Sequence, residues 1–141
     1  RSEDIKKLNY LMQKHACEIG TLASPIKNIE ELKNKNIVKV ETKKKLNESN
    51  FVNAIDFFRE VPSSKNKIIY HHIGIYAYDV KTLNKYINLK RTHNEINRSL
   101  EQMRAIDNNI SIHVALSSSF PLGVDTKEDF VAVKKSMEYK D

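Results

Sequence analysis

The first apolar positions of the chain recur at helical spacing. After Ser2, apolar side chains fall at Ile5, Leu8, Leu11, Met12 and Ile19. Residues three and four apart share one face of a helix, so this stripe predicts a helix over roughly residues 3–16. A short strand over residues 18–23 is expected next, ended by Ser24-Pro25. The sequence Asn28-Ile29-Glu30-Glu31 then has the capping-box pattern that begins a brief helix.

The segment 68–78 has the clearest strand pattern. Successive side chains of a strand point to opposite faces. One face would therefore carry Ile69, Ile73, Ile75 and Ala77, and the other Tyr70, His72, Gly74, Tyr76 and Tyr78. Further strands are predicted over residues 37–40 and 51–58, and over the alternating apolar positions from Ile110 to Leu116.

Helices are expected after the main strand. Asp79 can cap a helix that carries Leu83, Tyr86 and Ile87. Two more helices are predicted, one through Ile96, Leu100 and Met103 that ends near Asp107, and one with Phe130, Val133 and Met137 facing inward. Strands that alternate with helices predict an α/β fold, as a single domain over residues 1–141. The chain opens on a helix, without the strand–turn–helix unit that usually begins such a fold.

Composition and charge narrow the class of protein. The 141 residues carry a formal net charge of +6, most densely at Lys43-Lys44-Lys45, but no aromatic stacking positions or groove-reading helix accompany them. We therefore interpret the run as a solvated loop and expect no nucleic-acid partner. The apolar stretches are too short to span a membrane, and no secretory segment is recognisable. The single cysteine, Cys17, also favours a reducing cytoplasm.

The face with Tyr70, His72, Tyr76 and Tyr78 is the first candidate site. In a regular strand His72 and Tyr76 would lie about 13 Å apart on one side, where they could hold two ends of an extended polar ligand. A half-buried aromatic face with hydroxyls paired to the backbone is an equally good interpretation of the pattern. His71 and His72 point to opposite faces and cannot chelate one metal ion.

Two other sets of polar residues follow. Glu101, Gln102 and Arg104 lie beside the apolar stripe of a predicted helix. A carboxylate next to an amide suits sugar hydroxyls, although composition alone favours an ordinary solvated helix face. Asp125, ahead of the last predicted helix, can either bind Mg²⁺ or cap that helix through Asp125-x-x-Glu128. With only three glycines, the chain cannot form a glycine-rich phosphate loop.

Three segments, in order along the chain, resemble one family, the CMP-KDO synthetases (3-deoxy-manno-octulosonate cytidylyltransferases). The strand motif of the family resembles residues 70–78, its Leu-Glu-Gln-Leu-Arg helix is similar to Leu100-Glu101-Gln102-Met103-Arg104, and its Gly-Val-Asp-Thr loop is similar to Gly123-Val124-Asp125-Thr126. The segments Thr21-Leu22-Ala23-Ser24-Pro25 and Val38-Lys39-Val40 also fall in the expected order. The resemblance covers nearly the whole chain.

The resemblance implies a fold and an activity. The fold would be the layered mixed sheet of the nucleotide-diphospho-sugar transferase type, and the reaction would transfer CMP from CTP to the acid sugar KDO in lipopolysaccharide synthesis, with Mg²⁺ and in a homodimer. His72, Tyr76, Glu101, Gln102 and Arg59 would contact the sugar, and Asp125 would act in catalysis as a Mg²⁺ ligand. The sequence departs from the family at Arg98, where a glutamate is common, and at the short segment after Arg59.

The family's triphosphate-binding loop and its second metal-binding aspartate have no counterpart here. The resemblance therefore implies the C-terminal, sugar-binding and dimerisation portion of the enzyme, without its N-terminal nucleotide-binding half and inactive on its own. Alternatives are a cytidylyltransferase for a related acid sugar and a non-catalytic binding protein that keeps the fold.

Overall fold

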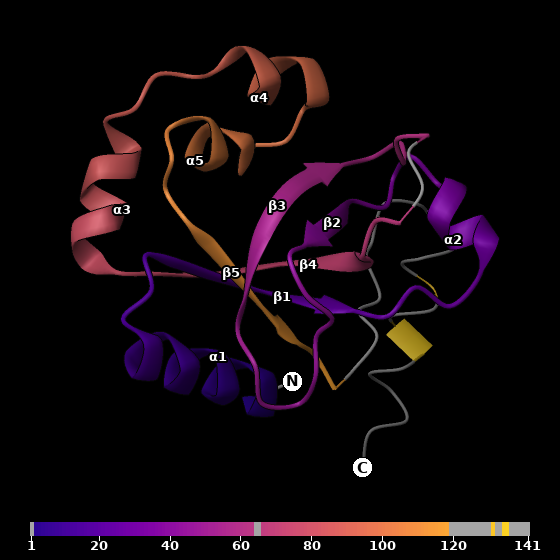
Figure 1. The fold of residues 1–141 in the computed structure, drawn as a ribbon, viewed down its shortest axis with the longest axis horizontal. Coiled ribbons are helices and arrows are strands. Elements are labelled where there is room, and N and C mark those ends of the chain that lie inside the picture. The colour runs from indigo at the N-terminus through magenta and orange to yellow at the C-terminus, as the bar shows by residue number, and fades with distance from the viewer. Residues whose placement is uncertain (1, 64–65, 119–130, 132–133, 136–141) are drawn as a thin grey trace.

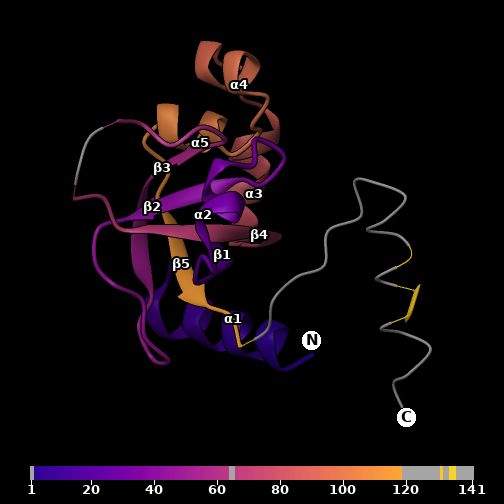
Figure 2. The same ribbon diagram turned by 90° about the vertical axis from the view of Figure 1, so that its right-hand side faces the viewer.

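The computed structural model shows a mixed sheet with helices on two sides of it (Figure 1, Figure 2). It describes residues 2–63, 66–118, 131, 134 and 135. Helix α1 lies below the sheet in both views, α4 and α5 lie above it, and α3 lies beside it at the left of Figure 1. The elements within the described residues are α1 (Ser2–His15), β1 (Ile19–Ser24), α2 (Ile29–Lys33), β2 (Lys39–Thr42), β3 (Val52–Phe58), β4 (Ile69–Tyr78), α3 (Val80–Ile87), α4 (His93–Arg98), α5 (Met103–Asp107) and β5 (Ile112–Leu116).

The five strands are ordered β1-β4-β2-β3-β5, and β5 pairs back onto β1. Among the described strands, β1 and β5 pair in parallel, and β1–β4, β4–β2, β2–β3 and β3–β5 are antiparallel. The α/β class and the mixed sheet predicted from the sequence are confirmed. The closure of the sheet was not foreseen, because strand alternation does not reveal which strands pair.

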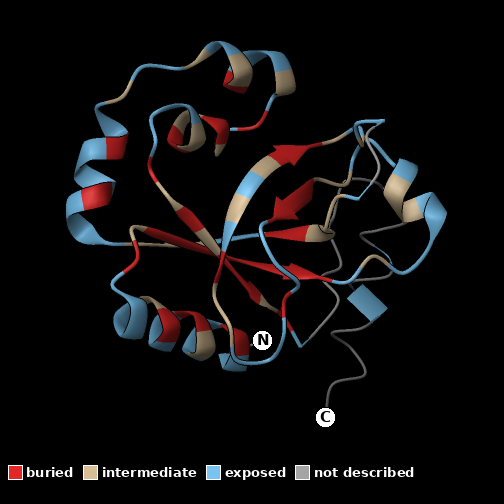
Figure 3. Cartoon of the chain, viewed as in Figure 1, coloured by how far each residue is buried: buried red, intermediate tan, exposed pale blue. Residues whose placement is uncertain are grey.

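Local signals in the sequence correctly located two short helices. The side chain of Asn28 accepts a hydrogen bond from the backbone N–H of Glu31, and that of Asp79 accepts one from Thr82. Each cap satisfies a donor that the first helical turn leaves free. Helix α3, which Asp79 caps, buries Thr82 and Tyr86 toward the sheet (Figure 3).

The core has two parts on the two sides of the sheet. Leu8 and Leu11 of α1 pack with Leu22, Ile73 and Ala115. Close approach of α1 requires Gly20, because an added Cβ there would lie 2.6 Å from Met12 Sδ and 2.8 Å from Phe51 Cζ. The larger cluster lies on the other side and includes Phe57, Tyr86, Leu100 and Met103, with Tyr76 and Tyr78 packed against it. The sequence therefore predicted correctly that Ile73 and the tyrosines of β4 lie on opposite faces of the strand.

The predicted regular alternation of β4 is wrong at its centre. Thr21 of β1 pairs with Tyr76, but the next residue, Leu22, pairs with Ile73, so Gly74 and Ile75 form a bulge. Both bulged residues are exposed, and Ile75 is not part of the apolar face to which the alternation assigned it. Because two residues are inserted, His72 and Tyr76 still point to the same face of the sheet.

The prediction of one long helix through Ile96, Leu100 and Met103 is also wrong. It is divided into α4 and α5 at Ser99, which has left-handed backbone angles of φ 52° and ψ 45°. The N–H of Leu100 then donates to the carbonyl of Glu95 at 3.1 Å, which closes the end of α4. A turn that includes Glu101 and Gln102 therefore separates two short helices.

Lysine residues near β2 have two different environments. Lys43, Lys44 and Lys45 are exposed, as expected of a solvated loop, and no ion pair involves them within the described residues. Lys39 is fully buried, and its Nζ donates to the carbonyl oxygens of Asn34 at 2.5 Å and Arg59 at 2.6 Å. Burial lowers the pKa of Lys39, and the positive charge of Arg59 lowers it further.

Candidate functional site

Two hollows lie next to the turn between α4 and α5. The smaller has a volume of about 100 Å³ and is lined by Ile19, Tyr76, Tyr78, Tyr86, Glu101, Gln102, Ala105 and Ile112. The larger has a volume of about 400 Å³ and is lined by Lys35, Asp56, Phe58, Arg59, Glu60, Pro62, Asn97 and Arg98. Three residues predicted to bind the sugar, Tyr76, Glu101 and Gln102, therefore line one hollow, although they come from two separate segments of the sequence.

Polar groups of the smaller hollow lack protein partners. Within the part of the chain that the structure describes, no hydrogen bond involves the hydroxyls of Tyr76 and Tyr78 or the side chains of Glu101 and Gln102. Tyr76, Tyr78 and Gln102 are half-buried, where polar groups are normally hydrogen-bonded, and Glu101 is exposed at the rim of the hollow. Two hydroxyls, a carboxylate and an amide around one hollow therefore provide donors and acceptors for a polar ligand.

The tyrosines of the smaller hollow stay protonated. Burial raises the pKa of Tyr76 far above its ordinary value, and the nearby hydroxyls of Tyr78 and Tyr86 and the carboxylate of Glu101 raise it further. Burial, followed by the charge of Glu101, raises the pKa of Tyr86 to about 12. Near neutral pH each of these phenols therefore remains a hydrogen-bond donor.

His72 lies in the core beside the smaller hollow and does not line it. Its ring centroid is 5.5 Å from that of Tyr76 and 5.1 Å from that of Phe57. The predicted separation of about 13 Å is wrong, because the bulge at Gly74 and Ile75 brings the two rings into contact. Its Nε2 lies 2.9 Å from Thr21 Oγ1, and Thr21 in turn donates to the carbonyl of Ile75 at 2.7 Å. The His72 ring thus packs against the Tyr76 ring on the side away from the smaller hollow.

Burial keeps His72 neutral. Only 8% of the residue is exposed, and burial, together with the charge of His71, lowers the pKa of His72 to about 3. At neutral pH the ring therefore carries no charge toward a ligand. In this arrangement its hydrogen bond fixes Thr21 at the level of the bulge.

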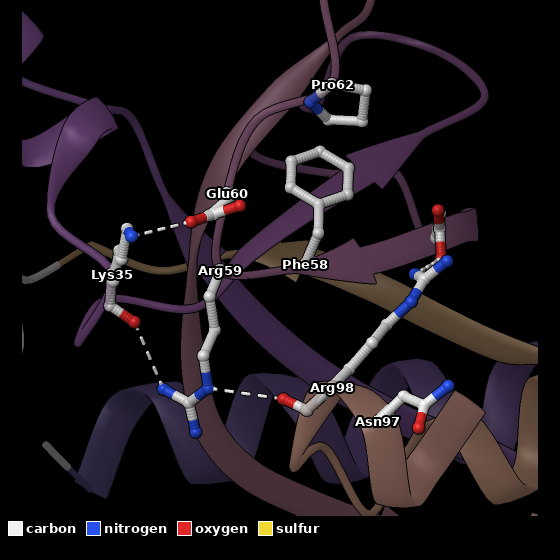
Figure 4. Close-up of a pocket in the computed structure, with 8 residues that line it drawn as sticks. Lys35, Phe58, Arg59, Glu60, Pro62, Asn97 and Arg98 are labelled. Atoms are coloured by element: carbon white, nitrogen blue, oxygen red, sulfur yellow. Dashed lines mark hydrogen bonds and ion pairs between the residues drawn. The ribbon is translucent and has the colours of Figure 1, made fainter. Parts of the chain in front are cut away.

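Arg59 lines the larger hollow and faces the main chain of the turn (Figure 4). Its guanidinium donates to the carbonyl oxygens of Arg98, Ser99 and Lys35 at 3.4, 3.2 and 3.3 Å. The three bonds join the loop after α2 to the end of α4. Arg59 therefore lines a different hollow from Tyr76, Glu101 and Gln102, beside the same turn.

Arg98 and Lys35 are paired with acids in the same hollow. Arg98 Nη1 lies 2.6 Å from Asp56 Oδ1 and donates to the carbonyl of Phe57 at 2.8 Å. Lys35 and Glu60 form a well-exposed pair at 2.8 Å. The arginine at the position where the resembled family has a glutamate is thus accommodated by an aspartate on β3.

Two observations concern other predicted features of the chain. Asp125, the expected Mg²⁺ ligand, and the inward positions expected of the last helix, Phe130, Val133 and Met137, lie outside the described residues. Among the residues that the structure does describe, no group of three or more His, Cys, Asp or Glu side chains is arranged to hold a metal ion, and no helix has the length and apolar character needed to cross a membrane.

Sequence reasoning missed the residues that support the turn. Tyr86 was expected only as an apolar position of its helix, yet its hydroxyl donates to the carbonyl of Glu101 at 3.0 Å. Glu95 was not singled out at all, although Thr92-x-x-Glu95 is a capping-box sequence that the structure contains. That pattern could have located the start of α4, but not the contact with the turn.

Comparisons with known proteins find relatives that carry the same enzyme name. The chain is 38% identical over 141 residues to 3-deoxy-manno-octulosonate cytidylyltransferase of Thermodesulfovibrio yellowstonii, which covers 97% of this chain and 55% of that protein. The enzyme of the same name from Bartonella bacilliformis is 38% identical over 125 residues, covering 89% of this chain and 51% of that protein. The chain spans about half the length of the curated relatives it matches. No family model matches the sequence.

A solved structure is similar as well. It is described as CMP:2-keto-3-deoxy-manno-octonic acid synthetase complexed with CTP. Its TM-score to this chain is 0.79 at 28% sequence identity, and the match covers 98% of this chain and 56% of that one. The fold of this chain is therefore similar to that of the solved synthetase, which is consistent with the fold that the sequence resemblance implies.

Proposed function

Over nearly its whole length the chain is homologous to part of the 3-deoxy-manno-octulosonate cytidylyltransferases, and on this premise we propose that it is the sugar-binding part of such an enzyme. The reaction would transfer CMP from CTP to KDO, giving CMP-KDO and pyrophosphate for lipopolysaccharide synthesis. The observation that supports this proposal is the smaller hollow, where Tyr76, Tyr78, Glu101 and Gln102 present polar groups without protein partners.

Each of these side chains has a role that follows from its chemistry. Glu101 would accept hydrogen bonds from two sugar hydroxyls, and Gln102 can both donate and accept. The hydroxyls of Tyr76 and Tyr78 would donate to ligand oxygens. A hollow of about 100 Å³ is smaller than typical small-molecule sites, so it would hold one edge of the sugar. The chain would thus orient the attacking hydroxyl, a contribution that lowers the barrier by fixing geometry.

The remaining assignments are proposals from the resemblance. Arg59 would contact the acid sugar after releasing carbonyls of the turn, and His72 would act through Tyr76. Mg²⁺ would supply charge stabilisation at the phosphates, with Asp125 as one of its ligands.

The test is direct turnover by the full-length protein. It should form CMP-KDO and pyrophosphate from CTP and KDO, measured by product chromatography. The 141-residue chain alone should form none, but should bind KDO in calorimetry. Turnover that prefers another acid sugar in a substrate panel would favour the related cytidylyltransferase. Neither turnover nor sugar binding by a cooperatively folded protein would indicate a non-catalytic binding protein.

We also propose a homodimer that uses α3. On its outer face Val80, Leu83 and Ile87 are 72%, 39% and 65% exposed, at a spacing that forms one apolar stripe. We expect the full-length protein to have twice its chain mass by light scattering. Leu83→Glu with Ile87→Lys should give monomers, whereas Lys85→Glu on another side of the helix should not. A monomeric wild type would contradict the proposal.

A further inference from the structure

The turn that carries Glu101 and Gln102 lies between two helices that cannot fix it by themselves. Helix α4 has six residues and α5 has five, and helices of this length are marginal in water. Ser99, at the start of the turn, also has the left-handed backbone that non-glycine residues adopt at some cost. The position of the turn must therefore come from contacts with other residues.

One carboxylate joins the two helices. Glu95 Oε2 accepts from the backbone N–H of Thr92 at 3.1 Å and from Arg104 Nε at 3.0 Å, and its Oε1 accepts from Arg104 Nη2 at 2.6 Å. The side chains of Glu95 and Arg104 are only 8% and 13% exposed. The hydrogen bonds from Arg104 lower the pKa of Glu95, so the carboxylate remains charged. A bidentate, partly buried pair of this kind fixes both distance and orientation.

The contacts continue from Arg104 to the turn itself. The guanidinium carbon of Arg104 lies 5.1 Å from the centroid of the Tyr86 ring, over which it is stacked. The hydroxyl of Tyr86 donates to the carbonyl of Glu101 at 3.0 Å. A continuous set of contacts thus runs from Glu95 through Arg104 and Tyr86 to the main chain of Glu101, whose side chain faces the smaller hollow.

We propose that Glu95 is a positioning residue for sugar binding, acting through Arg104 and Tyr86 on the turn at Glu101 and Gln102. The inference rests on the proposed function. Glu95 does not line the smaller hollow, and its effect would be on where Glu101 and Gln102 lie. Its loss should therefore weaken sugar binding selectively, because these contacts end at the turn that carries the proposed sugar ligands Glu101 and Gln102.

The test is Glu95→Gln in the full-length protein, which keeps the size of the side chain and removes its charge. We expect the KM for KDO to rise about fivefold or more, with the KM for CTP and kcat within about twofold of wild type. Hydrogen exchange of the amides of residues 100–103 should become about tenfold faster, reflecting local opening. Arg104→Lys, which keeps the charge but not the fork, should give an intermediate KM for KDO.

Asp107→Asn is the matched control. Asp107 is exposed and also links α5 to α4, through a 3.0 Å hydrogen bond from Asn94, without contacting Arg104 or Tyr86. It should leave both KM values unchanged. The proposal is overturned if Glu95→Gln behaves like this control, or if it raises both KM values together as general destabilisation would. Wild type without CMP-KDO synthesis would refute the proposed function, while hydrogen exchange would still test the positioning.

Discussion

Replacing Glu101 by glutamine should lower kcat/KM for the sugar roughly 100-fold, equivalent to about 3 kcal/mol lost from two charge-assisted hydrogen bonds. Within the described residues the Glu101 carboxylate has no hydrogen-bond partner, so its acceptors are available to a ligand. Glutamine has nearly the same shape but presents a donor where a sugar hydroxyl must also donate. The KM for CTP should change by less than about twofold.

A spectroscopic measurement tests the same substitution without substrate. The charge of Glu101 helps raise the pKa values of Tyr76, Tyr78 and Tyr86. Its removal should therefore let these phenols ionise at lower pH, seen as tyrosinate absorbance in an alkaline titration. Glu48→Gln, an exposed acid of the lysine-rich loop, is the control for both measurements and should change neither. A Glu101→Gln enzyme with wild-type kinetics would show that Glu101 does not bind the sugar.

The sequence predicted those parts of the fold that depend on local interactions. Asn28 and Asp79 cap their helices as expected, because a short polar side chain beside the first turn is sufficient for a cap. The apolar stripe with Leu8 and Leu11 predicts α1, since its spacing alone defines a buried face.

Features that depend on tertiary contacts were not predictable. The bulge at Gly74 and Ile75 is set by pairing with β1, which lies far earlier in the chain. The alternation of residues within β4 cannot show it. The apolar spacing of the sequence continues through Ser99, but the helix of the structure ends there. Arg59 and Tyr86 donate hydrogen bonds to carbonyls of the turn, and these contacts are not visible in the sequence. Nothing in the sequence distinguishes Lys39 from the exposed lysines near it, yet its Nζ is buried and donates to two backbone carbonyls.

The candidate site was predicted in part, for a related reason. Resemblance identified Tyr76, Glu101 and Gln102, which line one hollow. The residue pattern alone left Tyr76 undecided and favoured an ordinary solvated helix face for Glu101 and Gln102, since both patterns are common in proteins without such a site. Resemblance could not show that Arg59 faces the main chain of the turn or that His72 is buried behind Tyr76, because both depend on the packing of this chain.

The burial of His72 predicts an acid-sensitive fold. Its pKa is lowered to about 3 in the folded protein from an ordinary value of 6.5, so below that ordinary value the unfolded chain binds a proton that the folded one does not. Stability is therefore undiminished above pH 6.5 and falls progressively as the pH drops toward 3. Between roughly pH 7.5 and pH 5 the expected loss from this histidine is about 2 kcal/mol of unfolding free energy.

Urea unfolding of three proteins at those two pH values isolates the contribution of His72. His72→Gln keeps a donor for Thr21 but cannot be protonated, so its unfolding free energy should fall by about 2 kcal/mol less than that of wild type over the same interval. His93→Gln removes an exposed histidine and should follow wild type. Burial also lowers the pKa of His113, which remains in all three proteins, so its effect cancels in the comparison. If His72→Gln loses as much stability in acid as wild type does, His72 is already accessible to protons in the folded state and could face a ligand directly.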